Sequence, residues 1–175
     1  MRQAALCLLI KDYNPPSHSA KAERVPNQNK RELLLAMKKR GFGIGRWNGV
    51  GGKLDLEKGD GNIADAAVRE TEEEIGVKIK DLEKVAVLSF YFPYNRAWDQ
   101  DVHVFLVKNW KGEPRESEEM LPKWFKIEEI PYQEMWDDDK FWLPYILEGK
   151  KLKAKFVFEE GEKVSEKDVE VVENI

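Results

Sequence analysis

Residues 67–77 have the sequence Ala-Val-Arg-Glu-Thr-Glu-Glu-Glu-Ile-Gly-Val, and Gly51-Gly52-Lys53 stand upstream of them. Glu70 is three and four residues from Glu73 and Glu74, so a helix would place these carboxylates on one face. Like charges packed in this way repel one another and do not stabilise a helix. A divalent cation is the usual physical reason for such a cluster, because Mg²⁺ prefers oxygen ligands and shares them with substrate phosphates. The stretch therefore predicts a helix that carries a metal site.

The same helix has a buried face and a residue suited to each end. At about 100° per residue, one apolar arc collects Ile63, Ala64, Ala67, Val68, Thr71 and Ile75. The three acids fall on the adjoining arc, whereas Glu72 faces solvent. Arg69 can form an ion pair with Glu73 four residues later, and Asn62 and Gly76 are suited to the N-cap and the C-terminal stop. A charge run alone is typical of a solvated helix face, but the full arrangement of Gly-Gly-Lys, Arg-Glu, Glu-Glu and Gly favours the metal site.

This arrangement resembles the Nudix box, the signature of the Nudix hydrolases. The resemblance implies the Nudix fold and Mg²⁺-dependent cleavage of a nucleoside diphosphate linked to another group, with Mn²⁺ as a possible substitute. It also implies site roles, which can be carried over to this sequence. The residues expected at the reaction centre are Glu70, Glu73, Glu74 and Arg69, the metal ligands are these three glutamates with Gly51 and Glu119, and the phosphate ligands are Lys38 and Lys53.

One departure from the family pattern lies between the glycines and the helix. Arg69 follows Gly52 by seventeen residues, three more than in the pattern. The extra residues belong to the polar, glycine-rich segment 55–61, which a loop can absorb. Either Glu57 or Asp60 can stand for the first glutamate of the pattern.

Bulk composition restricts the class of protein. A chain of 175 residues and 20.4 kDa is expected to form one domain over residues 1–175. The net charge of −4 argues against a stable nucleic-acid partner, and no stretch approaches the roughly 20 apolar residues of a membrane helix. The single cysteine, Cys7, excludes an internal disulfide and suits a reducing cytosol. A cytoplasmic monomer is therefore expected.

The apolar pattern predicts strands alternating with two helices. Strands are expected at 3–10, 85–92, 102–107 and 124–127, a final hairpin at 156–158 and 169–172, and helices at 62–75 and 136–148. Residues 32–38 fit strand or helix on periodicity alone, and Pro144 would kink the second helix unless that helix begins late. Residues 11–30 are expected to form a loop. Together these elements predict an α+β fold with a mixed sheet between helices.

A longer resemblance covers segments 33–49, 101–105, 118–120 and 134–142. These are similar to the animal branch of the family that hydrolyses oxidised purine nucleoside triphosphates. The resemblance implies that Asn48 contacts the base, that Asp138 and Asp139 read its hydrogen-bonding edge and that Trp136 stacks on it. Phe42, Phe90 and Met120 would close the pocket. At Gln100 this sequence departs from the branch, which carries an apolar residue there.

The implied reaction releases pyrophosphate and a monophosphate from substrates such as 8-oxo-dGTP or 2-oxo-dATP, which would sanitise the nucleotide pool. Two crowded aspartates can share one proton and so accommodate differently oxidised bases. The residues leave open which modified purine is preferred and which glutamate is the general base. Two alternatives also stay open. One is a Nudix pyrophosphatase for ADP-ribose, a dinucleoside polyphosphate or an RNA cap, and the other is a catalytically silent nucleotide sensor.

Overall fold

The computed structural model describes residues 1–12 and 30–175. Its main elements are β1 (Arg2–Asp12), β2 (Arg31–Lys38), β3 (Trp47–Asn48), α1 (Ile63–Ile75), β4 (Lys78–Tyr91), β5 (Gln100–Lys111), β6 (Met120–Lys126), α2 (Asp139–Leu147), β7 (Lys151–Glu159) and β8 (Lys163–Val172). Short 3₁₀ helices occupy Arg96–Trp98, Ile127–Glu129 and Tyr132–Glu134.

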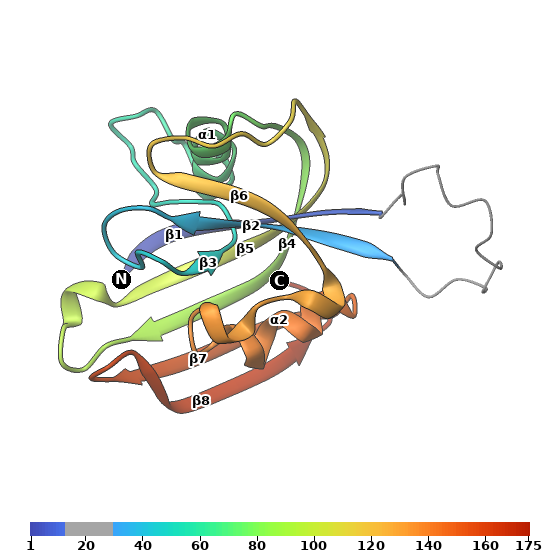
Figure 1. The fold of residues 1–175 in the computed structure, drawn as a ribbon. Coiled ribbons are helices and arrows are strands. Elements are labelled where there is room, and N and C mark those ends of the chain that lie inside the picture. Colours follow the sequence, from blue (N-terminus) through green and yellow to red (C-terminus); the bar gives the residue numbers. More distant parts are fainter. Residues whose placement is uncertain (13–29) are drawn as a thin grey trace, which may run out of the picture.

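The strands form one mixed sheet in the order β3-β2-β1-β5-β4-β7-β8, with β6 paired to β2. The pairs β1–β5 and β4–β7 are parallel, and the other pairs are antiparallel. Strand β2 meets β1 only where 31–33 pair with 10–12. Beyond that point β2, β3 and β6 diverge from the main sheet as an arm (Figure 1). Where β2 no longer pairs with β1, residues 50–53 lie along that edge of β1 and form isolated bridges at Cys7–Val50 and Ala4–Lys53.

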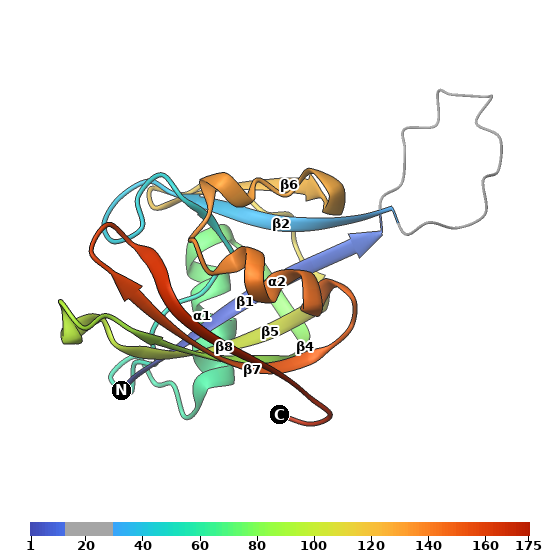
Figure 2. The same ribbon diagram turned by 90° about the horizontal axis from the view of Figure 1, so that it is seen from below.

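Both faces of the central strand β1 are buried, and each face belongs to a different hydrophobic core. Side chains alternate between the faces of a strand, so Leu6 and Leu8 join one core and Cys7 and Leu9 join the other. The first core also receives apolar side chains of α2, and the second receives those of α1. The two helices therefore cover opposite faces of the sheet, as the sequence predicts (Figures 1 and 2).

Helix α1 begins and ends at the residues that the sequence indicates. The Asn62 side chain accepts hydrogen bonds from the backbone N–H groups of Ala64 and Asp65, and the Asp65 carboxylate accepts from the Asn62 N–H, which completes a capping box. At the other end, Gly76 has φ of 73°, the left-handed conformation that ends helices most easily at glycine.

Several boundaries differ from the prediction. Strand β4 starts at Lys78 rather than at residue 85, and β5 and β6 are also longer at their starts than predicted. Residues 32–38 belong to a strand, and the predicted final hairpin is confirmed as β7–β8. Helix α2 begins at Asp139 rather than at residue 136, and it contains Pro144. Strand β1 continues to Asp12, and the rest of the predicted loop up to residue 29 lies outside the described residues.

Candidate active site

Two cavities adjoin each other at residues 51–53, and the first of them lies between the arm and the main sheet. The first, of about 210 Å³, collects side chains from β1, β2, β4, β5, β7 and the start of α2. The second, of about 410 Å³, lies against α1 and contains carboxylates. The two cavities share four residues of their walls: Lys38, Gly51, Gly52 and Lys53.

The shared wall requires glycine because other groups approach its backbone closely. A Cβ atom at Gly51 would lie 2.1 Å from the Ala5 carbonyl oxygen, and one at Gly52 would lie 2.4 Å from Cδ of Glu70. Both are far below van der Waals contact. The carbonyl oxygens of Val50 and Gly52 accept hydrogen bonds from β1. Since carbonyls alternate in an extended chain, the Gly51 carbonyl between them points away from β1.

The predicted metal ligands lie at the second cavity, with one exception. Glu70, Glu74 and Glu119 line it, and Gly51 forms part of its wall. Glu73 lines neither cavity, and its side chain is 47% exposed. Among the described residues, no three acidic, histidine or cysteine side chains are close enough as placed to hold one metal ion. Three of the four predicted glutamate ligands are paired with a cation instead: Glu70 with Arg69, Glu73 with Lys58 and Arg69, and Glu119 with Arg40.

Glu74 is the buried member of the acidic set. Burial and the negative charge of Glu70 raise the pKa of Glu74 to about 7, although a hydrogen bond from the Gly51 N–H at 3.2 Å acts to lower it. The ionised form of Glu74 is therefore penalised twice: its charge is shielded from solvent, and it is repelled by two neighbouring acids, Glu70 and Glu119. A bound divalent cation would relieve both penalties.

Arg69 lies in α1, where its side chain contacts the preceding segment 53–60, and it lines neither cavity. Its guanidinium makes two hydrogen bonds to Asp60, at 2.7 and 2.9 Å, and contacts Glu70 and Glu73. The hydrogen bond to Asp60 is the main cause of its raised pKa. Asp60 is buried whereas Glu57 is exposed. Its burial and its pairing with Arg69 favour Asp60 over Glu57 as the counterpart of the first glutamate of the pattern.

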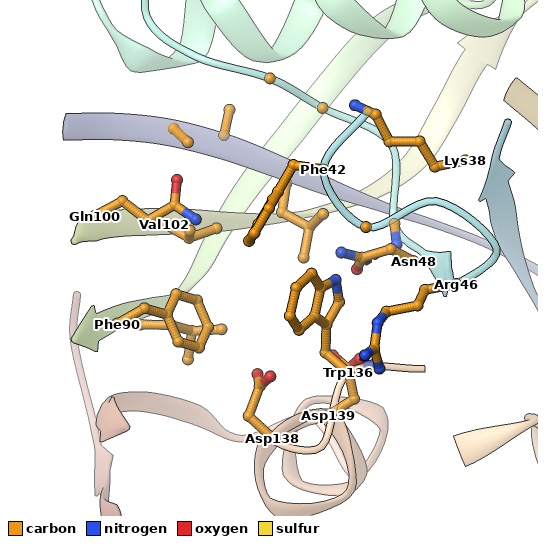
Figure 3. A pocket seen from close by; sticks show the side chains of 18 of the residues that line it. Lys38, Phe42, Arg46, Asn48, Phe90, Gln100, Val102, Trp136, Asp138 and Asp139 are labelled. Atoms are coloured by element: carbon orange, nitrogen blue, oxygen red, sulfur yellow. Dashed lines mark hydrogen bonds between the residues drawn. The ribbon is translucent and has the colours of Figure 1, made fainter. Parts of the chain in front are cut away.

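The first cavity contains every residue predicted to bind the base. The polar members are Asn48, Asp138 and Asp139, and the apolar members are Trp136, Phe42, Phe90 and Met120. Figure 3 shows the Phe42 ring beside the Trp136 indole, with Phe90 and Asp138 across the cavity. The Phe42 and Trp136 ring centroids are 5.0 Å apart.

The two aspartates at the base of the cavity are fully buried and lie side by side in the chain. Asp138 accepts a hydrogen bond from Nε1 of Trp142 at 2.9 Å, and Asp139 accepts one from the Trp136 backbone N–H at 3.0 Å. Burial raises the pKa of Asp138 to about 7, and burial together with the charge of Asp138 raises that of Asp139 well above its ordinary value. The positive charge of Arg46 opposes both shifts.

Several residues of this cavity have no signal in the sequence. Phe92 and Phe158 complete its wall from β4–β5 and β7, and Arg46 lies behind Trp136. Trp98 does not line the cavity but packs on Phe42, with centroids 4.9 Å apart. An aromatic-rich segment such as 90–98 is the only local hint, because the partners of these rings are distant in sequence.

Comparison with known proteins places the chain in a family. The sequence matches the family described as "NUDIX domain" over residues 24–146. It is 42% identical over 143 residues to a Danio rerio protein named "Oxidized purine nucleoside triphosphate hydrolase", covering 82% of this chain and 89% of the relative. It is 44% identical over 132 residues to the Mus musculus protein of the same name, covering 75% of this chain and 82% of the relative.

Solved structures agree on the fold. A MutT protein from Bacillus halodurans superposes with a TM-score of 0.75 at 20% identity, covering 97% of this chain and 98% of that one. The NUDIX domain of Shewanella oneidensis NrtR, solved with ADP ribose, gives a TM-score of 0.64 at 13% identity, covering 84% of this chain and 86% of that one. At these identities the likeness concerns the fold alone. The sequence match and the shared fold together show that this chain belongs to the Nudix family.

Proposed function

We propose that this chain is a single catalytic domain that hydrolyses oxidised purine nucleoside triphosphates to the monophosphate and pyrophosphate, with a divalent cation as cofactor. The observation that carries the proposal is the junction of the two cavities. The cavity that contains Asn48, Asp138 and Asp139 lies next to the carboxylate-lined cavity, and the two share part of their walls. The identity of 42–44% to relatives named for this activity supports the same substrate class.

The donor set of the second cavity fits Mg²⁺, or Mn²⁺ in its place. Glu70, Glu74 and Glu119 offer hard oxygens around one space, and the Gly51 carbonyl is free of β1. Glu73 is the fourth acid of the proposed set. When bound, the cation would neutralise phosphate charge and lower the pKa of a water to make it a nucleophile.

Different side chains would then bind the phosphates, accept the proton of the attacking water and position the metal ligands. Lys38 and Lys53 border both cavities, so their ammonium groups can hold phosphate oxygens at the junction. One carboxylate of the second cavity takes the proton of the attacking water. Arg69 orients Glu70 and Glu73 and does not touch the substrate.

The base pocket suits a purine. Guanine presents neighbouring N–H donors on one edge, which ionised carboxylates accept, while a protonated carboxylic acid can also donate. Because Asp138 and Asp139 are buried together, the pair is expected to hold one proton near neutral pH and to place it as the base requires. Trp136 would stack on the base, with Phe42, Phe90 and Met120 as further apolar walls.

The proposed substrates are free nucleotides of the cytoplasm, and the proposed enzyme is a monomer. In residues 1–12 and 30–175, no helix has the length and apolar character needed to cross a membrane. The formal charge of −4 is unsuited to stable nucleic-acid binding.

A substrate panel tests the proposal directly. Pyrophosphate release would be measured with Mg²⁺ for 8-oxo-dGTP, 2-oxo-dATP, dGTP and dATP, and phosphate-containing products for ADP-ribose, a dinucleoside polyphosphate and capped RNA. We expect kcat/KM to be highest for an oxidised purine triphosphate. The highest value for ADP-ribose or a cap would assign another Nudix substrate, and no turnover of any substrate would indicate a nucleotide sensor.

A further inference from the structure

The wall of the base pocket has a support behind Trp136 that the proposed function does not use. We propose that Arg46 and Glu162 are positioning residues that together hold the Trp136 indole as the stacking surface for the base. This inference rests on the proposed function, and it concerns residues that touch neither the phosphates nor the acidic cavity. These two residues form the Arg46–Glu162 brace.

Arg46 contacts the Trp136 segment at two points. Its guanidinium carbon lies 4.5 Å from the centroid of the Trp136 ring, and its Nη1 donates to the Met135 carbonyl oxygen at 3.2 Å. In Figure 3 the indole lies between Phe42 on one side and Arg46 on the other. Arg46 therefore backs the ring from the side away from Phe42, where a cation stacked on the indole stabilises its orientation.

Trp136 needs such support because its own backbone is outside regular structure. It lies between the 3₁₀ turn Tyr132–Glu134 and α2, and its N–H is fixed by Asp139. One edge of the indole packs on Gly43, where a Cβ atom would come within 3.3 Å of the ring. Phe42 lies on the cavity side of the indole and is 44% exposed, so a base that stacks on this side would displace it, and it restrains the ring less than a buried side chain would. The contact with Arg46 is the polar, directional restraint on the ring plane.

Glu162 fixes Arg46 in turn. The Glu162 carboxylate accepts from Nη2 of Arg46, and both side chains are about two-thirds buried. Glu162 lies in the turn between β7 and β8, and among the described residues it is the non-glycine residue with positive φ, 61°. A left-handed conformation is unfavourable for glutamate, so a compensating contact is expected. The ion pair with Arg46 is that contact, and it ties the hairpin turn to the pocket.

The brace has an electrostatic effect as well as a mechanical one. The charged groups that face the Asp138–Asp139 pair are Arg46 and Asp137, with Tyr132 also near Asp139. Asp137 is itself compensated by Lys140 and Lys163. Arg46 is thus the cation that favours ionisation of the pair, and Glu162 moderates its charge. Loss of either brace residue should move the titration of the pair, in opposite directions.

Steady-state kinetics with 8-oxo-dGTP test the mechanical part. For Arg46→Met and Glu162→Gln we expect KM to rise about tenfold and kcat to stay within about twofold, because the acidic cavity is unchanged. The control pair is Lys151–Glu83, an ion pair between β7 and β4 at 3.1 Å that is remote from the pocket. Lys151→Met and Glu83→Gln should leave both constants unchanged. A fall in kcat at constant KM in the brace variants would overturn the proposal.

The pH dependence of kcat/KM tests the electrostatic part. The apparent pKa of the limb that belongs to the aspartate pair should rise by about one unit in Arg46→Met and should fall in Glu162→Gln. Arg46→Lys should restore the position of the limb, because the charge is kept, while KM stays raised because an ammonium cannot stack as a planar guanidinium does. Shifts in the same direction for Arg46→Met and Glu162→Gln would contradict the assignment.

A measurement without substrate separates the brace from the proposed function. The indole N–H signal of Trp136 can be assigned in a ¹H–¹⁵N spectrum by its loss in Trp136→Phe. We expect this signal to shift or broaden in Arg46→Met and Glu162→Gln, while the signals of Trp110 and Trp124, which stack on each other and line neither cavity, keep their positions. An unchanged Trp136 signal in both variants would refute the brace whatever the activity. A shifted signal in an enzyme with no activity on oxidised purines would refute the proposed function alone.

Discussion

Glu74 combines burial, an elevated pKa and a place in the proposed metal site. Replacement by glutamine keeps the shape of the side chain and its acceptor for the Gly51 N–H, but removes the negative charge. We expect Glu74→Gln to lower kcat by on the order of 10²–10³-fold or more. The melting temperature without added metal should not fall, because a buried carboxylate beside Glu70 is replaced by a neutral group. Pyrophosphate release and thermal melts measure the two quantities.

Glu72 provides the matched control on the same helix. It is exposed, pairs with Lys78 on the solvent side and lines neither cavity. Glu72→Gln should therefore retain full activity, since an exposed ion pair contributes little. An active Glu74→Gln enzyme, or an equal loss of activity in both variants, would rule out the assignment of Glu74 to the metal.

The buried aspartate pair makes the free energy of unfolding of the protein depend on pH. The pKa of Asp138 is about 7 in the folded chain, against 3.8 for an unperturbed group. Between these values the unfolded chain has released a proton that the folded chain retains, so the folded state loses stability as pH rises. Asp138→Asn removes the contribution of Asp138 and lowers the pKa of Asp139, because the charge of Asp138 is one cause of its elevation. We expect the free energy of unfolding to fall less from pH 5 to pH 8 in the variant, by on the order of 1–3 kcal/mol.

Asp137→Asn is the control for this experiment, measured by urea unfolding at the same two pH values. Although burial raises the pKa of Asp137, hydrogen bonds from Lys140 and from the Val164 N–H lower it overall. Its contribution is fully present at both pH 5 and pH 8, so the variant should be less stable than the wild type by a similar amount at each. If Asp138→Asn keeps the pH dependence of the wild type, Asp138 does not titrate in this range.

Among the secondary-structure elements, α1 depends on its first turn. Asn62 and Asp65 exchange hydrogen bonds with the backbone there, which satisfies N–H groups that have no partner inside the helix. Asn62→Ala should destabilise the protein by about 1 kcal/mol, or about 2–4 °C in melting temperature for a domain of this size. Asn174→Ala, at the exposed C-terminal end, should change neither. An unchanged melting temperature for Asn62→Ala would show that α1 is held by packing alone.

Elements with local signals are predictable, and elements set by distant partners are not. Helix α1 is predictable in full because Asn62, Gly76 and the apolar arc lie within one continuous stretch. Strand β4 is predicted only from residue 85, because residues 78–84 are largely exposed and carry no apolar alternation. The two-residue strand β3 exists only through its pairing with Ala36 and Met37. The start of α2 is displaced because Trp136 turns into the pocket instead of joining the helix.

At the scale of the whole molecule, the sequence locates the acidic helix but not the walls opposite it. The base pocket gathers side chains from residue 4 to residue 158, and its purine-reading members were expected from a resemblance rather than from any local pattern. The contact between Arg46 and Glu162 joins residues 116 positions apart. Such contacts follow from the sheet order, in which β7 lies beside β4 only because α2 carries the chain back across the sheet.

The common wall of the two cavities predicts that metal and nucleotide bind cooperatively. Lys38, Gly51, Gly52 and Lys53 face both spaces, so a cation that neutralises the phosphates should tighten nucleotide binding, and the nucleotide should tighten metal binding equally. Thermal melts of chelator-treated enzyme would be recorded with Mg²⁺ alone, with a non-hydrolysable purine triphosphate analogue alone, and with both. We expect the joint shift in melting temperature to exceed the sum of the separate shifts.

Glu74→Gln should reduce the joint shift to that sum. Pyrophosphate release by the wild-type enzyme should cease in excess chelator and return with Mg²⁺ or Mn²⁺. Additive shifts in the wild type, or turnover in excess chelator, would show that the two cavities act independently and that the acids of α1 do not hold a catalytic metal.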